Sequence, residues 1–177
     1  MPYISHYDSP LGRLLLAADD AGLTGVWFEG QKYFAPGLDE SWRERETAVF
    51  AQTRRWLDRY FSGREPEDDV PLHLVGTRFQ REVWEILRAI PYGQTMTYGA
   101  IARTMAARRG LARMSAQAVG GAVGHNRISI LVPCHRVVGT DGSLTGYAGG
   151  IERKRSLLAL EGVDVSALTV PRQGTAL

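Results

Sequence analysis

The chain has 177 residues, of which 44% are hydrophobic and 23% are charged, proportions typical of a globular protein with a buried core. We expect no membrane span, because no apolar run approaches about 18 residues, and no signal peptide, because residues 1–12 lack a basic start followed by an apolar stretch. One cysteine excludes an internal disulfide and a cysteine-rich zinc site and favours a reducing, cytoplasmic setting.

The net charge of +2 is distributed unevenly along the chain. Residues 1–75 hold 8 Lys and Arg against 13 Asp and Glu, and residues 76–177 hold 13 against 6, so the net charges are −5 and +7. A basic half suggests a polyanionic partner, although chance clustering on a solvated surface explains the same numbers. Nearly all the basic residues are arginine, which suits bidentate contact with phosphate.

The first part of the chain predicts a mixed α/β domain. Three short apolar runs predict strands at residues 3–7, 11–18 and 23–28. From Ser41 to Phe61 the large apolar residues recur with a helical period, and Gly63 ends the pattern. Residues 70–75 predict a last strand. We therefore place a domain over residues 1–75, a second over residues 76–166, and a loosely ordered tail over residues 167–177.

The second part predicts three helices that each follow a capping hydroxyl. The caps and helices are Thr77 before residues 78–90, Thr97 before residues 98–107, and Ser115 before residues 116–124. The last signal is weak, because Gly120 and Gly121 each cost about 1 kcal/mol against alanine in a helix. Two short consecutive helices are typical of a helix-turn-helix.

The only cysteine lies in an unusual local sequence. The apolar run 128–132 predicts a buried strand that leads into Pro133, Cys134, His135 and Arg136. A lone cysteine is most often a small buried hydrophobe, but positive neighbours lower the pKa of a thiol and make it nucleophilic.

A histidine can take the thiol proton if a carboxylate orients it, and a closing helix over residues 152–161 supplies candidates. Glu152 and Glu161 are the first choices and Asp141 is the third. Adjacent residues of a strand face opposite sides, so Cys134 and His135 need a turn or a bridging water to cooperate. A cysteine hydrolase remains an alternative here, because His6, His73 and His125 are also available.

The stretch from Ile130 to Val138 (ILVPCHRVV) resembles the active-site motif of the O6-alkylguanine-DNA alkyltransferases. Residues 118–122 (AVGGA), 145–150 (TGYAGG) and 154–162 (KRSLLALEG) are similar to other sequences of that family. The resemblance covers residues 76–162 and is looser before them. It implies an α/β (α+β) protein, with an N-terminal ribonuclease-H-like α/β domain followed by a helical winged helix-turn-helix catalytic domain.

The resemblance also implies a role for each catalytic position. Cys134 is the alkyl acceptor, and His135 is its base through a water molecule. Glu161 orients His135, and Asn126 braces the turn before the active-site segment. Tyr98 helps to rotate the target nucleotide out of the duplex and protonates the departing guanine. The product is a stable thioether, so the protein is expected to act once, with no cofactor and no metal.

The remaining implied residues contact DNA. The partner is double-stranded DNA that contains O6-alkylguanine, with O4-alkylthymine as a second substrate, bound by a monomer through the minor groove. Because the O6 atom is inaccessible in a duplex, the base must be flipped, at a cost of a few kcal/mol. The residues expected to bind DNA or the flipped base are Ser115, Ala116, Gln117, Tyr147, Ala148, Gly149, Arg136 and Arg113.

The chain departs from the family at two places. Gln117 stands where the family usually has an arginine that fills the space left by the flipped base, so we expect weaker DNA binding or slower flipping. The connection over residues 105–113 is longer than usual, and we expect Arg108, Arg109 and Arg113 to add phosphate contacts. A solvated loop without a role is the competing interpretation.

Two function classes therefore remain beside the cysteine hydrolase. The first is a suicide DNA alkyltransferase, a methylated-DNA–protein-cysteine S-methyltransferase. The second is a lesion-binding relative that recognises alkylguanine without repairing it. Cys134 argues against the second class, because such proteins lack the acceptor.

Overall fold

The computed structural model describes residues 2–170, and the chain forms two compact units. Among the described residues, the first unit contains residues 2–75 together with Arg127–Ser129, and the second contains Gly76–Asn126 and residues 130–170. Both units combine helices with strands, so the predicted mixed α/β class is confirmed. Within residues 2–170 no helix is long and apolar enough to cross a membrane.

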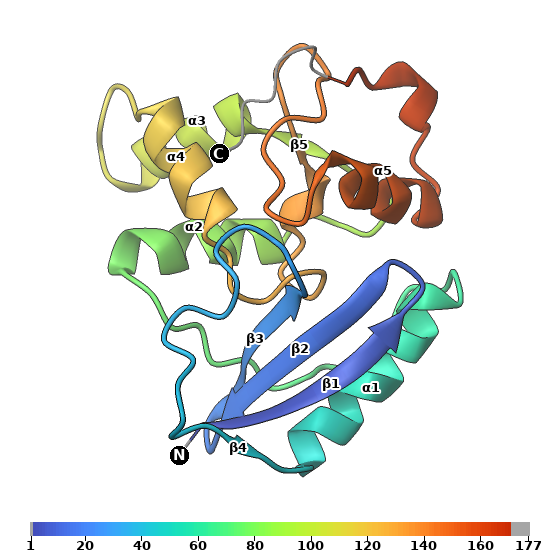
Figure 1. Ribbon diagram of the computed structural model, residues 1–177. Coiled ribbons are helices and arrows are strands. Elements are labelled where there is room, and N and C mark those ends of the chain that lie inside the picture. The colour runs from blue at the N-terminus through green and yellow to red at the C-terminus, as the bar shows by residue number, and fades with distance from the viewer. Residues whose placement is uncertain (1, 171–177) are drawn as a thin grey trace. The chain divides into compact units, whose positions relative to one another are not determined.

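The N-terminal unit is a sheet with one helix packed along it (Figure 1). The strand order is β3-β2-β1-β4; β1 and β4 pair in parallel, and the pairs β1–β2 and β2–β3 are antiparallel. Leu14–Ala18 in the central strand β2 are all buried, because both faces of a central strand can be covered. The elements are β1 (Tyr3–Ser9), β2 (Gly12–Asp19), β3 (Gly22–Phe28), β4 (Arg43–Glu44) and α1 (Ala48–Phe61).

Two expectations for this unit are wrong at their boundaries. The helix expected from Ser41 begins at Ala48, because the Thr47 side chain accepts a hydrogen bond from the Phe50 N–H and caps it there. Arg43 and Glu44 instead pair with β1 as β4. The strand expected at residues 70–75 is reduced to an isolated bridge between Leu72 and Leu23.

The C-terminal unit is mainly helical (Figure 1). Its elements are α2 (Arg78–Arg88), β5 (Met96–Thr97), α3 (Tyr98–Arg108), α4 (Ala116–Gly124), the 3-10 turn η1 (Cys134–Arg136), β6 (Val137–Val138), α5 (Ile151–Leu160) and the 3-10 turn η2 (Val165–Ala167). All three predicted caps are confirmed: Thr77, Thr97 and Ser115 each accept a hydrogen bond from the backbone three residues on.

The helices α2, α3 and α4 pack against one another. The indole N–H of Trp84 in α2 donates to the carbonyl of Ala122 in α4 at 2.8 Å, and this bond fixes the two helices together inside the unit. The consecutive helices α3 and α4 are therefore in contact, as a helix-turn-helix requires.

The buried strand expected over residues 128–132 does not form. Arg127 and Ser129 make backbone hydrogen bonds to Val26 of β3, at 2.8 and 3.0 Å, but Ile130 then has φ +73°. A β-branched residue in this left-handed region is strained, and a strand cannot continue through it. The chain instead turns and enters η1, so Cys134 lies in a 3-10 turn rather than at the end of a strand.

Part of the expected tail is held in place. The N–H of Leu144 donates to the carbonyl of Thr169 at 2.8 Å, and the N–H of Thr169 donates to the carbonyl of Gly142 at 3.1 Å. Leu168 packs against the buried residues Val138, Leu144 and Leu158. Residues 167–169 are thus ordered, and residues 171–177 lie outside the described part of the chain.

Candidate active site

Cys134 begins the turn η1 and is 5% exposed. The side-chain amide of Asn126 donates one hydrogen bond to Sγ of Cys134 at 3.2 Å and another to the Val132 carbonyl at 2.8 Å. The N–H of Cys134 donates to that same carbonyl at 2.8 Å. Asn126 thereby fixes both the turn and the sulfur that it presents.

The thiol differs in its resting state from the sequence-based expectation. Burial raises the pKa of Cys134, and this outweighs the lowering effects of the Asn126 hydrogen bond and of the Lys154 charge. The expected low pKa from positive neighbours is therefore wrong. Cys134 is a protonated thiol and needs a base before it can attack.

His135 follows Cys134 in the turn, and its side chain is fully buried. Its Nε2 is hydrogen-bonded to Oε2 of Glu161. Because a carboxylate only accepts, Nε2 carries the proton and Nδ1 keeps the basic lone pair. Burial lowers the pKa of His135 against the raising effect of Glu161, so the imidazole is neutral and able to take a proton.

Glu161, the C-cap of α5, is the carboxylate of this site. Its Oε1 accepts from Nε of Arg136 at 2.7 Å and from the N–H of Gly93 at 3.0 Å. Gly93 has φ +77°, a conformation that favours glycine. Burial on its own would raise the pKa of Glu161, but His135 and Arg136 outweigh it and lower the pKa to about 2. Glu161 is therefore ionised and fixed in orientation.

The other two candidate carboxylates are placed elsewhere. Glu152 is exposed in the first turn of α5. Asp141 accepts a hydrogen bond from the Ser143 N–H at 3.0 Å, within the turn that follows β6.

Arg136 has a different position from the one expected for a DNA-binding residue. It is 7% exposed, and its Nη1 donates to the Ile90 carbonyl at 2.8 Å while its Nε binds Glu161. The guanidinium also lies over the Tyr92 ring, 5.7 Å from its centroid. Arg136 therefore connects the end of α2 to Glu161, and the sequence-based assignment to DNA contact is corrected.

Tyr98, the first residue of α3, is buried beside the loop that precedes α5. Its hydroxyl donates to the carbonyls of Thr145 and Gly146, at 3.0 and 3.2 Å. Burial raises the pKa of Tyr98, and the charge of Cys134 adds to this effect. Tyr98 is thus a protonated phenol that holds residues 145–146 and is electrostatically coupled to the sulfur.

Lys154 is a residue of the site that sequence reasoning missed. Its side chain is fully buried, and its Nζ donates to the Thr145 carbonyl at 2.8 Å and lies 5.9 Å from the centroid of the Tyr98 ring. Burial lowers the pKa of Lys154 to about 8, against the raising effect of Cys134. The sulfur of Cys134 is the negative charge that favours the ammonium form of Lys154, so the ammonium can stabilise negative charge at Cys134.

The loop 145–150 carries the residues expected to bind the base. Tyr147 is buried, whereas Ala148 and Gly149 are partly exposed. The N–H of Gly150 donates to the Tyr147 carbonyl at 2.9 Å and closes the turn. Through Thr145 and Gly146, this loop is joined to Tyr98 and Lys154.

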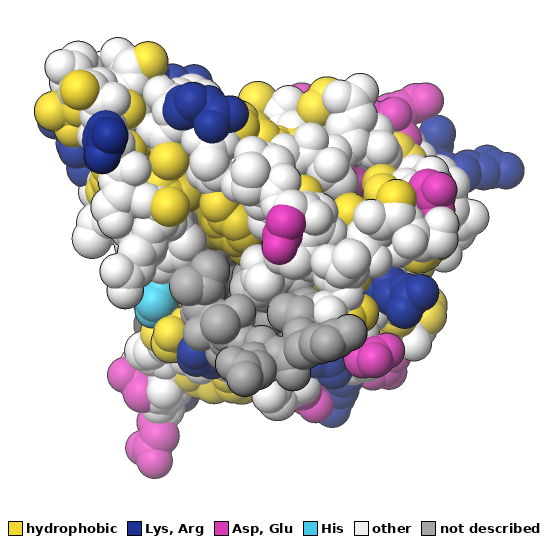
Figure 2. All heavy atoms as spheres, turned by 90° about the horizontal axis from the view of Figure 1, so that it is seen from above, with side chains coloured by type: hydrophobic (Ala, Val, Ile, Leu, Met, Phe, Trp, Pro, Cys, Tyr) yellow, Lys and Arg dark blue, Asp and Glu magenta, His cyan; other side chains and the backbone are white. Residues whose placement is uncertain are grey.

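The residues expected to bind the groove lie at the start of α4. Ser115, Ala116 and Gln117 are exposed, and Arg113 is exposed just before them. Figure 2 shows Lys and Arg side chains among hydrophobic ones at the corner where the connection between α3 and α4 lies in Figure 1. The structure therefore presents the first turn of α4 to solvent, as contact with a groove requires.

Comparison with known proteins adds to this geometry. The DNA-binding domain of 6-O-methylguanine DNA methyltransferase matches residues 78–163, and the ribonuclease-like domain of the same protein matches residues 3–74. The chain belongs to the 6-O-methylguanine DNA methyltransferase family. The N-terminal unit is the ribonuclease-like domain of this methyltransferase family, and the helical unit is its DNA-binding domain.

Relatives of this methyltransferase align along most of the chain. The methylated-DNA–protein-cysteine methyltransferase of Haemophilus influenzae is 44% identical over 161 residues, covering 90% of this chain and 86% of its own. That of Mycolicibacterium paratuberculosis is 48% identical over 154 residues, covering 87% and 88%. The crystal structure of Mycobacterium tuberculosis OGT in complex with DNA has a TM-score of 0.79 at 43% identity and covers 94% of each chain.

Proposed function

We propose that this methyltransferase repairs DNA by transferring the alkyl group of O6-alkylguanine to Sγ of Cys134. The main support for the proposal is the buried thiol of Cys134, which accepts a hydrogen bond from Asn126 and is followed in the same turn by a neutral His135. The family membership and the relatives named methylated-DNA–protein-cysteine methyltransferases support it.

The first step is removal of the thiol proton. Nδ1 of His135 accepts it through a water molecule, and the resulting imidazolium is stabilised by the ionised Glu161. Lys154 and the Asn126 amide stabilise the thiolate. Because the pKa of the thiol is raised, Cys134 stays protonated until His135 removes its proton. The buried, ionised carboxylate of Glu161 stabilises the charged imidazole that this transfer produces.

The second step is displacement at the alkyl carbon. The sulfur forms a bond to that carbon while the bond from the carbon to O6 breaks, and the electron pair leaves with the guanine. The Tyr98 hydroxyl then donates its proton to the departing base, and the proton held by His135 restores the phenol. The products are guanine and S-alkylcysteine, so each protein molecule reacts once.

Access to O6 requires that the base leaves the duplex. Tyr147 and the backbone of Ala148 and Gly149 receive the flipped base, and the first turn of α4 lies in the minor groove. Gln117 occupies part of the space that the base leaves. The protein acts as a monomer in the cytoplasm, where its free thiol stays reduced, and it also accepts O4-alkylthymine.

The competing function is recognition of the lesion without transfer. It needs the loop 145–150 and α4 but not a nucleophile with a base and a fixed carboxylate. The arrangement of Cys134, His135 and Glu161 would have no purpose in such a protein.

Titration with a duplex that contains one O6-methylguanine tests the proposal. The expected result is that unmodified guanine, measured by chromatography of digested DNA, appears in equal amount to the protein added and then stops. Unchanged O6-methylguanine in DNA that the protein retains on a gel would favour recognition without transfer. Guanine formed in large excess over protein would exclude a suicide reaction.

A further inference from the structure

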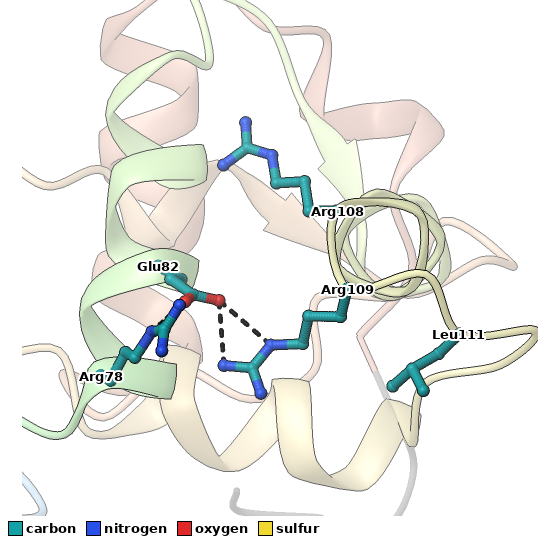
Figure 3. A pocket seen from close by; sticks show the side chains of 5 residues that line it. All are labelled: Arg78, Glu82, Arg108, Arg109 and Leu111. Carbon is teal, nitrogen blue, oxygen red and sulfur yellow. Dashed lines mark hydrogen bonds and ion pairs between the residues drawn. The ribbon is translucent and has the colours of Figure 1, made fainter.

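A pocket of about 560 Å³ lies in the DNA-binding domain, away from the residues of the active site. It is formed between the first turns of α2 and the end of α3 with the connection that follows (Figure 3). The lining residues are Arg78, Glu82, Arg108, Arg109 and Leu111. Three guanidinium groups therefore face one carboxylate, and the pocket has a net positive charge.

Arg109 is the fixed part of this pocket. Its Nε and Nη2 donate to Oε2 of Glu82 at 3.1 and 2.9 Å, as the dashed lines of Figure 3 mark. Its guanidinium also lies 5.2 Å from the centroid of the Phe79 ring. Arg109 thus fixes the long connection to α2. Its side chain is already ordered, so no further side-chain entropy is lost at Arg109 when a ligand binds.

The side chain of Arg108 makes no hydrogen bond or ion pair with any residue that the structure describes. Figure 3 shows its guanidinium extended from the end of α3 toward α2. Arg78 reaches the same pocket from α2, where its Nε is 3.1 Å from Oε1 of Glu82, and its side chain is 86% exposed. Two guanidinium groups therefore keep donors for an anion.

The pocket adjoins the helix that is expected to lie on DNA. The connection that carries Arg108, Arg109 and Leu111 leads directly into Ser115, the N-cap of α4. Leu111 also lines a neighbouring hollow that extends to Ala116. Leu111 therefore links the pocket to the first turn of α4, where Gln117 contributes no charge.

We propose that this pocket binds a backbone phosphate of the duplex, with Arg108 and Arg78 as the contacting groups and the Arg109–Glu82 pair as their frame. This inference rests on the proposed repair of DNA. A phosphodiester suits the pocket, because guanidinium groups bind phosphate oxygens with directed pairs of N–H donors. The contact replaces part of the attraction that an arginine at position 117 would supply.

Binding of an undamaged duplex at several salt concentrations tests the proposal. A protein that loses one phosphate contact loses about one unit from the slope of log K against log salt. Arg108→Ala is expected to lower the slope, and the double variant Arg78→Ala/Arg108→Ala, which removes both groups that contact the one phosphate, is expected to lower it by about one unit in all. The control is Arg55→Ala, which removes an exposed arginine of α1 and is expected to leave the slope unchanged.

Transfer from free O6-benzylguanine separates the two proposals, because the free base has no phosphate. Arg108→Ala is expected to react with it at the rate of the unaltered protein. An unchanged salt slope in Arg108→Ala would overturn the phosphate contact. A rate of transfer that falls as much with the free base as with the duplex would also overturn it, because such a loss indicates a general effect on the fold. Failure of the unaltered protein to react with either substrate would instead overturn the proposed function.

Calorimetric titration with inorganic phosphate distinguishes the source of the anion. We expect no saturable binding, because an isolated phosphate gains only this contact, whereas the duplex adds its contact with α4. Saturable binding that Arg108→Ala abolishes would assign the pocket to free phosphate and overturn its assignment to the DNA backbone.

Discussion

Arg136 and His135 are neighbours in the sequence and bind opposite oxygens of one carboxylate. Nε of Arg136 donates to Oε1 of Glu161 at 2.7 Å, and Nε2 of His135 is bonded to Oε2. Both side chains are buried. Arg136 therefore sets the orientation of the group that orients the base, and it acts without touching the reacting atoms.

Replacement of Arg136 tests this positioning role. In Arg136→Met the charge that lowers the pKa of His135 is lost, so that pKa rises and more of the imidazole is protonated at a given pH. The rate of transfer from free O6-benzylguanine should fall about tenfold or more, which is part of the rate enhancement that a general base supplies. In the pH profile of this rate, the fall on the acid side should move to higher pH. Arg136→Lys should keep part of the rate. A variant that reacts normally with the free base but binds DNA weakly would show that Arg136 contacts DNA after all.

Glu161 should make stability depend on pH in the acid range. Its pKa is about 2 in the folded protein against an ordinary 4.5, so its contribution is fully present above pH 4.5 and is lost as the pH falls toward 2. The shift corresponds to about 3 kcal/mol of unfolding free energy. Urea unfolding of Glu161→Gln should lose this dependence, whereas Glu152→Gln, in the exposed first turn of α5, should keep it. Equal acid slopes in all three proteins would contradict the buried ionised carboxylate.

Lys154 should contribute to reactivity at the expense of stability. In Lys154→Met the charge that lowers the pKa of Cys134 is lost, so iodoacetamide should alkylate the thiol about tenfold more slowly for each pKa unit. Unfolding free energy should stay equal or rise by about 1 kcal/mol, because a buried ammonium without a carboxylate partner is costly. Arg155→Met, which alters the exposed neighbour, should change neither. A parallel loss of stability and reactivity would indicate a structural role for Lys154.

Gln117 should limit DNA binding and base flipping but not the transfer of the alkyl group to Cys134. Gln117→Arg adds a cation to the exposed first turn of α4, so it should tighten binding, raise the salt slope by about one unit and speed transfer from duplex DNA. Transfer from the free base should stay constant. If binding and transfer from the duplex are both unaltered, glutamine serves at this position as well as arginine.

Local signals predicted the helices of the DNA-binding domain well. Thr77, Thr97 and Ser115 precede apolar periodicity and cap the helices as expected, because a capping hydrogen bond involves residues only three apart. The expected strand at residues 128–132 fails for the opposite reason. Its apolar run satisfies a periodicity rule, but Arg127 and Ser129 pair with β3, which is distant in the sequence, and Ile130 then makes a left-handed turn.

The sequence predicted which residues form the candidate site better than it predicted their pKa values. Cys134, His135 and Glu161 came from a motif, but the raised pKa of the thiol depends on burial that no sequence neighbour reveals. Lys154 did carry a signal, because it precedes Leu157, Leu158 and Glu161 by three, four and seven residues and so shares their helix face. Arg136 was expected to bind DNA or the flipped base, but its partner Glu161 lies 25 residues further along the chain, and no local pattern indicates that contact.

The mass of the intact protein after reaction with an O6-methylguanine duplex tests the central claim most directly. The account predicts that every active molecule gains the mass of one CH₂ unit, that peptide mapping places the gain on Cys134, and that Cys134→Ser shows no gain while it still binds the duplex. A protein that binds the duplex and restores no guanine, with Cys134 unmodified, would contradict the account.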